Sequence, residues 1–257
     1  MVRVPLPAAF LCQPLAHRGL HDRAAGRIEN SLSAIGAAIA AGYGIEIDLQ
    51  LSADGVPMVF HDDDLDRLTD ASGPVRAKTA AELGAIALKG STDPIPTFAQ
   101  GLALVAGRAP LLVELKDQSL TMTATDACLE AATAAALHGY QGPVALMSFN
   151  PHTIAHLARL APDLPRGLTT SAYDPADWHP LPVTRCAELR EIPDYDRTLS
   201  SFISHEAADL ARPRVTALKA QGAKILCWTI RSREAEAKAR RIAHNITFED
   251  YPAALPA

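Results

Sequence analysis

The sequence has no run of about 18 apolar residues, no basic tract and no closely spaced pair of cysteines. The first absence excludes a transmembrane helix. The second, in a chain of net charge -5, argues against nucleic acid as a partner. The four cysteines lie far apart, so we expect reduced thiols and a cytoplasmic protein. The proline-interrupted opening, residues 2–12, is too short for the apolar region of a signal peptide.

A glycine-rich phosphate-binding loop is also missing. The first predicted strand, residues 14–19, ends in His17-Arg18-Gly19 instead, which disfavours a doubly wound dinucleotide-binding sheet. Strand and helix patterns alternate about seven or eight times, and the length of 257 residues suits a closed (β/α)8 TIM barrel. We predict one catalytic TIM-barrel domain over residues 1–257. A short polar insert, residues 63–96, follows the third predicted strand at 57–62.

Acidic residues mark one strand in particular. Over residues 44–52, aliphatic residues alternate with polar ones that include Glu46 and Asp48, the period of a β-strand. On a barrel strand the aliphatic face packs against the outer helices and the acids point into the mouth. The alternative is an edge strand with a solvated face. Three further strands carry polar residues at the same end, which favours a site there: His17 and Arg18, His61, and Glu114 and Lys116.

These residue types fit one kind of chemistry. Carboxylates at positions 46, 48 and 114 form an all-oxygen set that suits Mg²⁺, Ca²⁺ or Mn²⁺ better than Zn²⁺. With one divalent cation bound, Arg18 and Lys116 leave the site with a single positive charge, which a monoanionic phosphodiester would balance. Two histidines that titrate near neutrality can divide the proton removal and proton donation that diester cleavage needs.

Motifs along nearly the whole chain resemble the glycerophosphodiester phosphodiesterase family. The two histidines with Glu46-Ile-Asp48 between them are the most specific part. One departure is His244–Glu249, where the family usually has an aspartate–glycine pair before its last strand. The matching motifs, in chain order, are His17-Arg18-Gly19, Glu29-Asn30, Glu46-Ile-Asp48, Ser52-Ala-Asp-Gly55, His61-Asp62, Leu65-x-Arg67-x-Thr69, Ile95-Pro-Thr97, Glu114-Leu-Lys116, Ser148-Phe149, Trp228-Thr-Ile and Asp250-Tyr-Pro252.

The resemblance implies metal-dependent hydrolysis of a glycerophosphodiester to sn-glycerol 3-phosphate and an alcohol. It implies His17 and His61 as the acid–base pair, Glu46, Asp48 and Glu114 as ligands of one divalent cation, and Arg18 and Lys116 as phosphate-binding residues. We add Asn30 and Trp228 to the substrate-binding candidates. Asn30 is explained equally well as a helix cap, and Trp228 as a core residue.

Several alternatives stay open at this point. The nucleophile is water or the glycerol 2-hydroxyl, either histidine can be the acid, and His61 could touch the metal. A non-hydrolytic phosphodiester-binding barrel and a phospholipase D-like enzyme acting on lysophospholipids are the competing functions. The sequence does not indicate the alcohol or the oligomeric state. Asp62 is expected to orient a histidine, and the seven other histidines, His21 among them, are treated as structural or surface residues.

Overall fold

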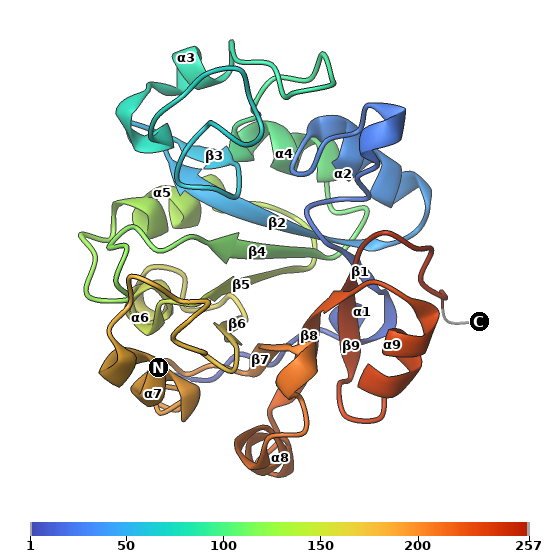
Figure 1. Cartoon of the computed structure of the whole chain (residues 1–257), viewed down its shortest axis with the longest axis vertical. Coiled ribbons are helices and arrows are strands. Elements are labelled where there is room, and N and C mark those ends of the chain that lie inside the picture. Colours follow the sequence, from blue (N-terminus) through green and yellow to red (C-terminus); the bar gives the residue numbers. More distant parts are fainter. Residues whose placement is uncertain (1, 256–257) are drawn as a thin grey trace.

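The computed structural model describes residues 2–255, in which eight parallel strands close into a barrel (Figure 1). The first strand pairs with both the second and the last, so the sheet has no free edge along these strands. This arrangement confirms the predicted TIM barrel. The barrel strands are β1 (Leu15–Ala16), β2 (Gly44–Leu51), β4 (Leu111–Leu115), β5 (Val144–Ser148), β6 (Arg166–Thr170), β7 (Phe202–Glu206), β8 (Lys224–Ile230) and β9 (Asn245–Phe248).

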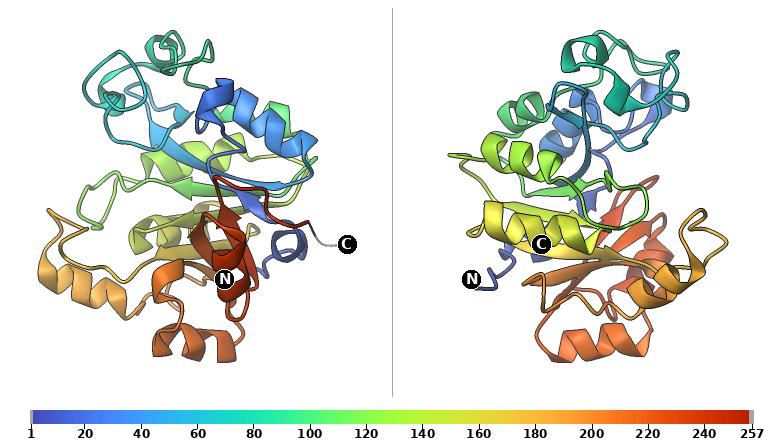
Figure 2. Two further views of the ribbon diagram at one scale, coloured as in Figure 1. Left: turned by 45° about the vertical axis from the view of Figure 1, so that its right-hand side comes forward. Right: turned by 90° about the vertical axis from the view of Figure 1, so that its left-hand side faces the viewer.

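Helices surround the barrel, as Figure 2 shows. Aliphatic residues on the outer face of the strands, such as Ile45 and Ile47, are fully buried against them. The helices are α2 (Leu32–Ala40), α4 (Phe98–Val105), α5 (Cys128–Ala136), α6 (Pro151–Leu160), α7 (Val183–Arg190), α8 (Pro213–Ala220) and α9 (Arg233–Ala239), with the 3-10 turns η1 (Arg23–Ala25) and η3 (Ala207–Asp209). The helix α5 begins only at Cys128, because the residues between it and β4 form a loop. No helix among residues 2–255 combines the length and apolarity that crossing a bilayer requires.

The helix α1 (Ala9–Cys12) covers the end of the barrel at which the parallel strands begin. Phe10 on this helix belongs to an apolar cluster with inward-facing residues of the strands, including Leu112 and Leu226. Asn245, the first residue of β9, donates hydrogen bonds to the carbonyl oxygens of Phe10 and Gln13 at 2.8 and 2.6 Å. The barrel is therefore a packed core at this end, and polar residues can gather only at the other.

The strand expected at residues 57–62 is present in part, as β3 (Pro57–Val59), but the expectation that it is a parallel barrel strand was wrong. It pairs antiparallel with β2, Val59 opposite Leu49. A turn at Ala53–Gly55 reverses the chain where β2 rises above its barrel neighbours, and the Phe60 N–H then donates to the Asp48 carbonyl oxygen at 3.0 Å. The chain thus returns to the height of the acidic residues.

The insert after β3 builds a small core of its own beside the barrel. It contains α3 (Ala80–Leu83) and the 3-10 turn η2 (Val75–Ala77), and it lies above β2 in Figure 1. Phe60, Leu65 and Leu88 are among its buried apolar residues. Although the insert is polar in composition, these side chains hold it against β3 and fix the position of the residues at 61–67.

Candidate active site

The three predicted metal ligands meet at one point inside the barrel mouth. Glu46 and Asp48 come from β2, and Glu114 from β4 stands beside Asp48 in the parallel register. Their exposed fractions are only 2%, 2% and 5%, and one oxygen from each lies within 4.8 Å of the other two. The predicted inward orientation is confirmed, and the alternative of a solvated edge strand is wrong.

Among the described residues, the cationic side chains nearby form ion pairs with Asp48 and Glu114 but not with Glu46. Lys116 Nζ lies 2.9 Å from Glu114 and 3.6 Å from Asp48, and Arg18 Nε lies 3.5 Å from Asp48. Glu46 accepts a hydrogen bond from the Arg18 backbone N–H at 2.9 Å, but none of the ion pairs within residues 2–255 includes it. Burial, together with the charges of Asp48 and Glu114, raises the pKa of Glu46 well above its usual value.

The carboxylate cluster has the chemistry of a site for a hard cation. All three donors are oxygens, which suit Mg²⁺ or Ca²⁺. Burial opposes the charge on Asp48, yet the neighbouring His61, Lys116 and Arg18 keep its pKa below the usual range. Glu46 is the carboxylate that a further positive charge would stabilise most, because repulsion and burial disfavour its ionised form. The residues present therefore fit one divalent cation.

Asn30 lies behind the carboxylates rather than against the cavity. The helix α2 is capped by Ser31, whose Oγ accepts from the Ala34 N–H at 3.1 Å, so the cap interpretation of Asn30 was wrong. The Asn30 amide donates to Asp48 Oδ2 at 2.9 Å and its Oδ1 accepts from the Asp48 N–H at 3.2 Å. These two contacts fix the position of the Asp48 carboxylate.

Both predicted catalytic histidines are held through the same ring nitrogen. His17 Nδ1 lies 2.5 Å from Glu249 Oε2, and His61 Nδ1 lies 2.6 Å from Asp62 Oδ1. The expectation that Asp62 orients a histidine is confirmed in this geometry. Burial is the main factor that lowers the pKa of His17, and the Arg18 charge adds to it, while Glu249 opposes both. In both rings Nε2 is the nitrogen that these contacts leave available.

An ion-pair network connects Asp62, the partner of His61, to Arg18 at the end of β1. Arg67 contacts Asp62 at 2.6 Å and Glu29 at 2.8 Å, and Glu29 contacts Arg18 at 2.6 Å. Arg67 and Glu29 both belong to motifs of the predicted family. Since every member has a charged partner, the network holds the guanidinium of Arg18 at the edge of the carboxylate cluster.

The turn after β1 requires its glycine. Gly19 has a φ of 78°, and a Cβ there would lie 2.8 Å from the backbone carbon of Ala34. The preceding residue, Arg18, also has a positive φ of 54°. A non-glycine residue in the left-handed region is strained, and such strain is concentrated at functional sites. The turn allows β1 to end with His17 and Arg18 both directed at the site.

One cavity of about 170 Å³ collects the polar groups. Its apolar wall includes Phe149 and Trp228, whose rings lie 5.5 Å apart and edge to face, and the Trp228 indole N–H donates to the Ser204 carbonyl oxygen at 3.1 Å. Arg231 and Thr247 also line it. Eight of the nine predicted site residues are in its wall, all except Asn30: His17, Arg18, Glu46, Asp48, His61, Glu114, Lys116 and Trp228. Such a cavity can bind a small anion between charged groups and an aromatic wall.

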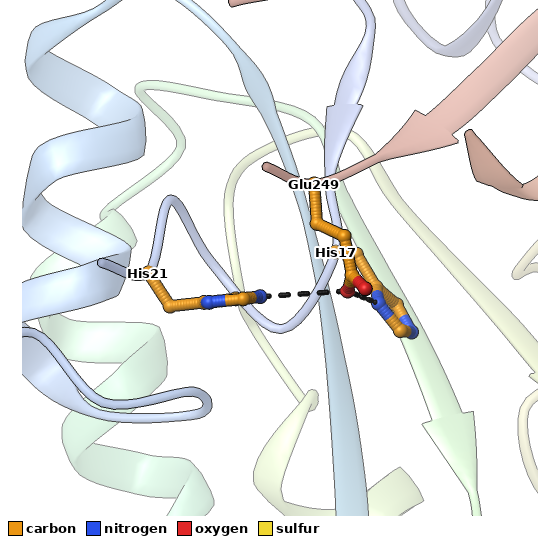
Figure 3. Close-up of side chains that lie close together, drawn as sticks. All are labelled: His17, His21 and Glu249. Atoms are coloured by element: carbon orange, nitrogen blue, oxygen red, sulfur yellow. Dashed lines mark hydrogen bonds and ion pairs between the residues drawn. The ribbon is translucent and has the colours of Figure 1, made fainter. Parts of the chain in front are cut away.

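Sequence reasoning missed Glu249 and its neighbours. Glu249 lies directly after β9 and contacts His17, as Figure 3 shows. His21, which we had treated as structural or surface, places Nε2 3.5 Å from the same carboxylate, and Arg231 lies 2.6 Å from its other oxygen. A usable signal existed, because the first and last strands of a closed barrel are neighbours and Glu249 follows the last one.

Comparisons with known proteins agree with this geometry. A family model described as the glycerophosphoryl diester phosphodiesterase family matches residues 17–254. A glycerophosphodiester phosphodiesterase of Caldanaerobacter subterraneus is 28% identical over 173 residues, covering 64% of this chain and 69% of the relative. An uncharacterised protein of Mycobacterium tuberculosis is 33% identical over 103 residues, and the match spans only 34% of its length. The solved structure of an Oleispira antarctica phosphodiesterase in complex with the product sn-glycerol-3-phosphate has a TM-score of 0.76 and 26% identity, covering 95% of both chains.

Proposed function

The chain belongs to the glycerophosphoryl diester phosphodiesterase family, and on that premise we propose that it hydrolyses glycerophosphodiesters to sn-glycerol 3-phosphate and an alcohol. One observation carries the proposal: two imidazoles, three carboxylates and three cationic side chains line a single cavity. The product bound by the Oleispira antarctica phosphodiesterase supports the same substrate class. We also propose a cytoplasmic location, because the four cysteines are free thiols.

One divalent cation, Mg²⁺ or Ca²⁺ with Mn²⁺ as a further candidate, would be held by Glu46, Asp48 and Glu114. When bound, it would stabilise negative charge on the non-bridging oxygens of the phosphate. Asn30 would act here by orienting Asp48, which revises its proposed role from substrate contact to support of a metal ligand.

Arg18 and Lys116 would bind the phosphate. Arg18 Nε is buried and makes no hydrogen bond within residues 2–255, so a donor remains for an incoming oxygen. Burial works against the charge of Lys116, but Glu114 and Asp48 raise its pKa, and the ammonium stays charged at neutral pH. Trp228, with Phe149, would form the apolar wall against the carbon skeleton of the substrate.

His17 and His61 would divide the proton transfers. One imidazole takes the proton of the nucleophile, either water or the glycerol 2-hydroxyl, as its oxygen bonds to phosphorus. The other gives a proton to the alcohol oxygen as its bond to phosphorus breaks. Attack by water gives glycerol 3-phosphate directly, whereas attack by the 2-hydroxyl gives a cyclic phosphate that water then opens, with the two proton transfers reversed. Because each Nδ1 is held by a carboxylate, Nε2 is the nitrogen that exchanges the proton in either case.

The decisive experiment measures release of glycerol 3-phosphate from water-soluble glycerophosphodiesters and, in parallel, cleavage of lysophospholipids. We expect the soluble diesters to be preferred, because a cavity of about 170 Å³ suits a small polar ligand better than an acyl chain. His17→Ala and His61→Ala should each lower kcat by on the order of 10²–10⁴. Chelation by EDTA should abolish turnover and a divalent ion should restore it.

Two outcomes would count against this function. Binding of the diesters without release of glycerol 3-phosphate would support a non-hydrolytic binding protein. Preferential cleavage of lysophospholipids would support a phospholipase D-like enzyme. Turnover that both alanine variants leave near the wild-type value would exclude the acid–base assignment.

A further inference from the structure

Closure of the barrel brings a carboxylate to the back of one proposed catalytic ring. Ala16 at the end of β1 is paired with Phe248 at the end of β9, so His17 and Glu249 are each the first residue beyond neighbouring strands. The His17 N–H donates to the Phe248 carbonyl oxygen at 2.9 Å, which fixes this register. The side chains then meet with His17 Nδ1 2.5 Å from Glu249 Oε2 (Figure 3).

The two oxygens of Glu249 have separate partners. Oε1 accepts from Arg231 Nε at 2.7 Å, while Oε2 faces His17 and also lies 3.5 Å from His21 Nε2. Burial opposes its charge, but contacts with His17 and His21 and the charge of Arg231 hold the pKa of Glu249 far below its usual range. The carboxylate is therefore ionised and can only accept hydrogen bonds, so the proton between it and His17 belongs to Nδ1.

The same three groups, His17, His21 and Glu249, are close enough to resemble a metal site. Two features argue against that use. The Arg231 guanidinium already neutralises the carboxylate, and Nδ1 and Oε2 lie 2.5 Å apart, in direct hydrogen-bond contact that leaves no space for a cation between them. A hydrogen bond from His17 Nδ1–H to the carboxylate, rather than a cation, accounts for the contact between His17 and Glu249.

We propose that Glu249 is a positioning residue, which holds His17 in the tautomer protonated at Nδ1 and turns its Nε2 lone pair toward the cavity. The inference rests on the proposed acid–base role of His17. When His17 takes up a proton at Nε2, the adjacent carboxylate stabilises the imidazolium, and when it releases that proton the ring returns to the same tautomer. Arg231 and His21 keep the carboxylate in place from the other sides.

Kinetics of Glu249→Gln test the proposal against a matched control. Glu236 is also a buried carboxylate with an arginine partner, Arg240 at 2.7 Å, but it contacts no histidine among the described residues. We expect Glu249→Gln to lower kcat by on the order of 10²-fold with KM within about twofold, and Glu236→Gln to leave both unchanged. Glu249→Asp keeps the charge and should recover part of the loss.

A second cavity offers a chemical rescue. It measures about 750 Å³ and is lined by Glu249 and His21, with Arg23 and Arg27 also in its wall. In Glu249→Ala, acetate entering this cavity can take the place of the missing carboxylate. We expect acetate to raise kcat of this variant by about tenfold or more, without effect on the wild type or on His17→Ala.

The tautomer itself can be read from ¹⁵N NMR of histidine-labelled protein. His17 should be protonated at Nδ1 in the wild type and become a mixture of tautomers in Glu249→Ala. This measurement needs no turnover, so it decides the positioning claim even if the proposed hydrolysis fails. The proposal is overturned if His17 is protonated at Nε2 in the wild type, if its tautomer is unchanged in Glu249→Ala, or if Glu249→Gln keeps wild-type kcat. An equal loss of kcat in Glu236→Gln would overturn it as well.

Discussion

Replacing Glu46 with glutamine should make the metal-free protein more stable and, at the same time, unable to respond to metal. Glu46 is 2% exposed, and the only hydrogen bond of its side chain within the described residues comes from the Arg18 backbone N–H. A glutamine oxygen can accept that bond equally well. The substitution therefore removes one negative charge from between Asp48 and Glu114 and changes little else.

The size of the effect follows from the separations in the cluster. At 4.8 Å, the upper limit for the ligand oxygens, two unit charges repel by about 3.5 kcal/mol at an effective dielectric constant of ~20. Arg18 and Lys116 offset part of the repulsion that Asp48 and Glu114 exert on Glu46. We expect a net gain of about 2 kcal/mol, which for a chain of this length raises Tm by about 4–8 °C.

The gain should depend on pH in a defined direction. Folding raises the pKa of the Glu46 carboxyl above 4.5, the ordinary pKa of glutamate. Such a group destabilises the folded protein increasingly as pH rises above 4.5, and the destabilisation is largest once pH exceeds the folded-state pKa. Glutamine has no such cost. The difference in Tm between Glu46→Gln and the wild type should therefore be small near about pH 5 and largest near about pH 8.

Thermal unfolding followed by circular dichroism, with EDTA or with Mg²⁺ or Ca²⁺, measures both effects. With metal at about 100 times its Kd, the wild type should gain about 2.7 kcal/mol, and Glu46→Gln should gain almost nothing. Glu236→Gln is the control for losing a buried carboxylate with arginine and tyrosine partners, and it should lower Tm. If Glu46→Gln also lowers Tm in EDTA, Glu46 is a structural residue and the reasoning is refuted.

Three further predictions concern the same site. Since the raised pKa of Glu46 means that binding releases a proton, calorimetry should find metal affinity rising from about pH 5 to 7.5, and a flat profile contradicts this. Asn30→Ala should weaken metal binding by about 10–100-fold in the same assay, because Asp48 loses two hydrogen bonds, and unchanged affinity would exclude the supporting role. Gly19→Ala should lower stability to chemical denaturation by about 1–3 kcal/mol, since its Cβ would meet the Ala34 backbone in a left-handed conformation. If Gly19→Ala unfolds at the wild-type denaturant concentration, the turn after β1 can accommodate the added methyl group.

The inward carboxylates could be predicted because two independent regularities agreed. Alternation over residues 44–52 assigned Glu46 and Asp48 to one face, and the repeated strand–helix order assigned that face to the barrel interior. Once the fold is a parallel barrel, Glu114 on the next barrel strand must point inward at a similar height. Period and fold class therefore determine the acidic cluster without knowledge of any loop.

His61 shows where this reasoning stops. Its position was inferred from a parallel strand end, yet it arrives by an antiparallel hairpin. The inference succeeded only because β2 extends beyond the neighbouring barrel strands. The hairpin that β2 forms with β3 then brings the chain at Phe60 back to the height of Asp48. Two extra residues on β2 alone, with no matching residues on the returning strand, would have moved His61 by about 6–7 Å, away from the carboxylates. Local pattern indicates a turn at Ala53–Gly55 but not the height at which it lies.

Glu249 required information of a different kind. Its pairing with His17 depends on the register between the first and last strands, 232 residues apart, and no local pattern encodes that register. The polar partner of a barrel-rim residue can therefore be expected on the neighbouring strand but identified only after closure. The two histidine contacts differ in this respect. Asp62 directly follows His61 in the sequence, whereas Glu249 lies at the opposite end of the chain from His17. Since both supply the same contact to Nδ1, the need to orient an imidazole, rather than the sequence position of the acid, is what the two sides of the site share.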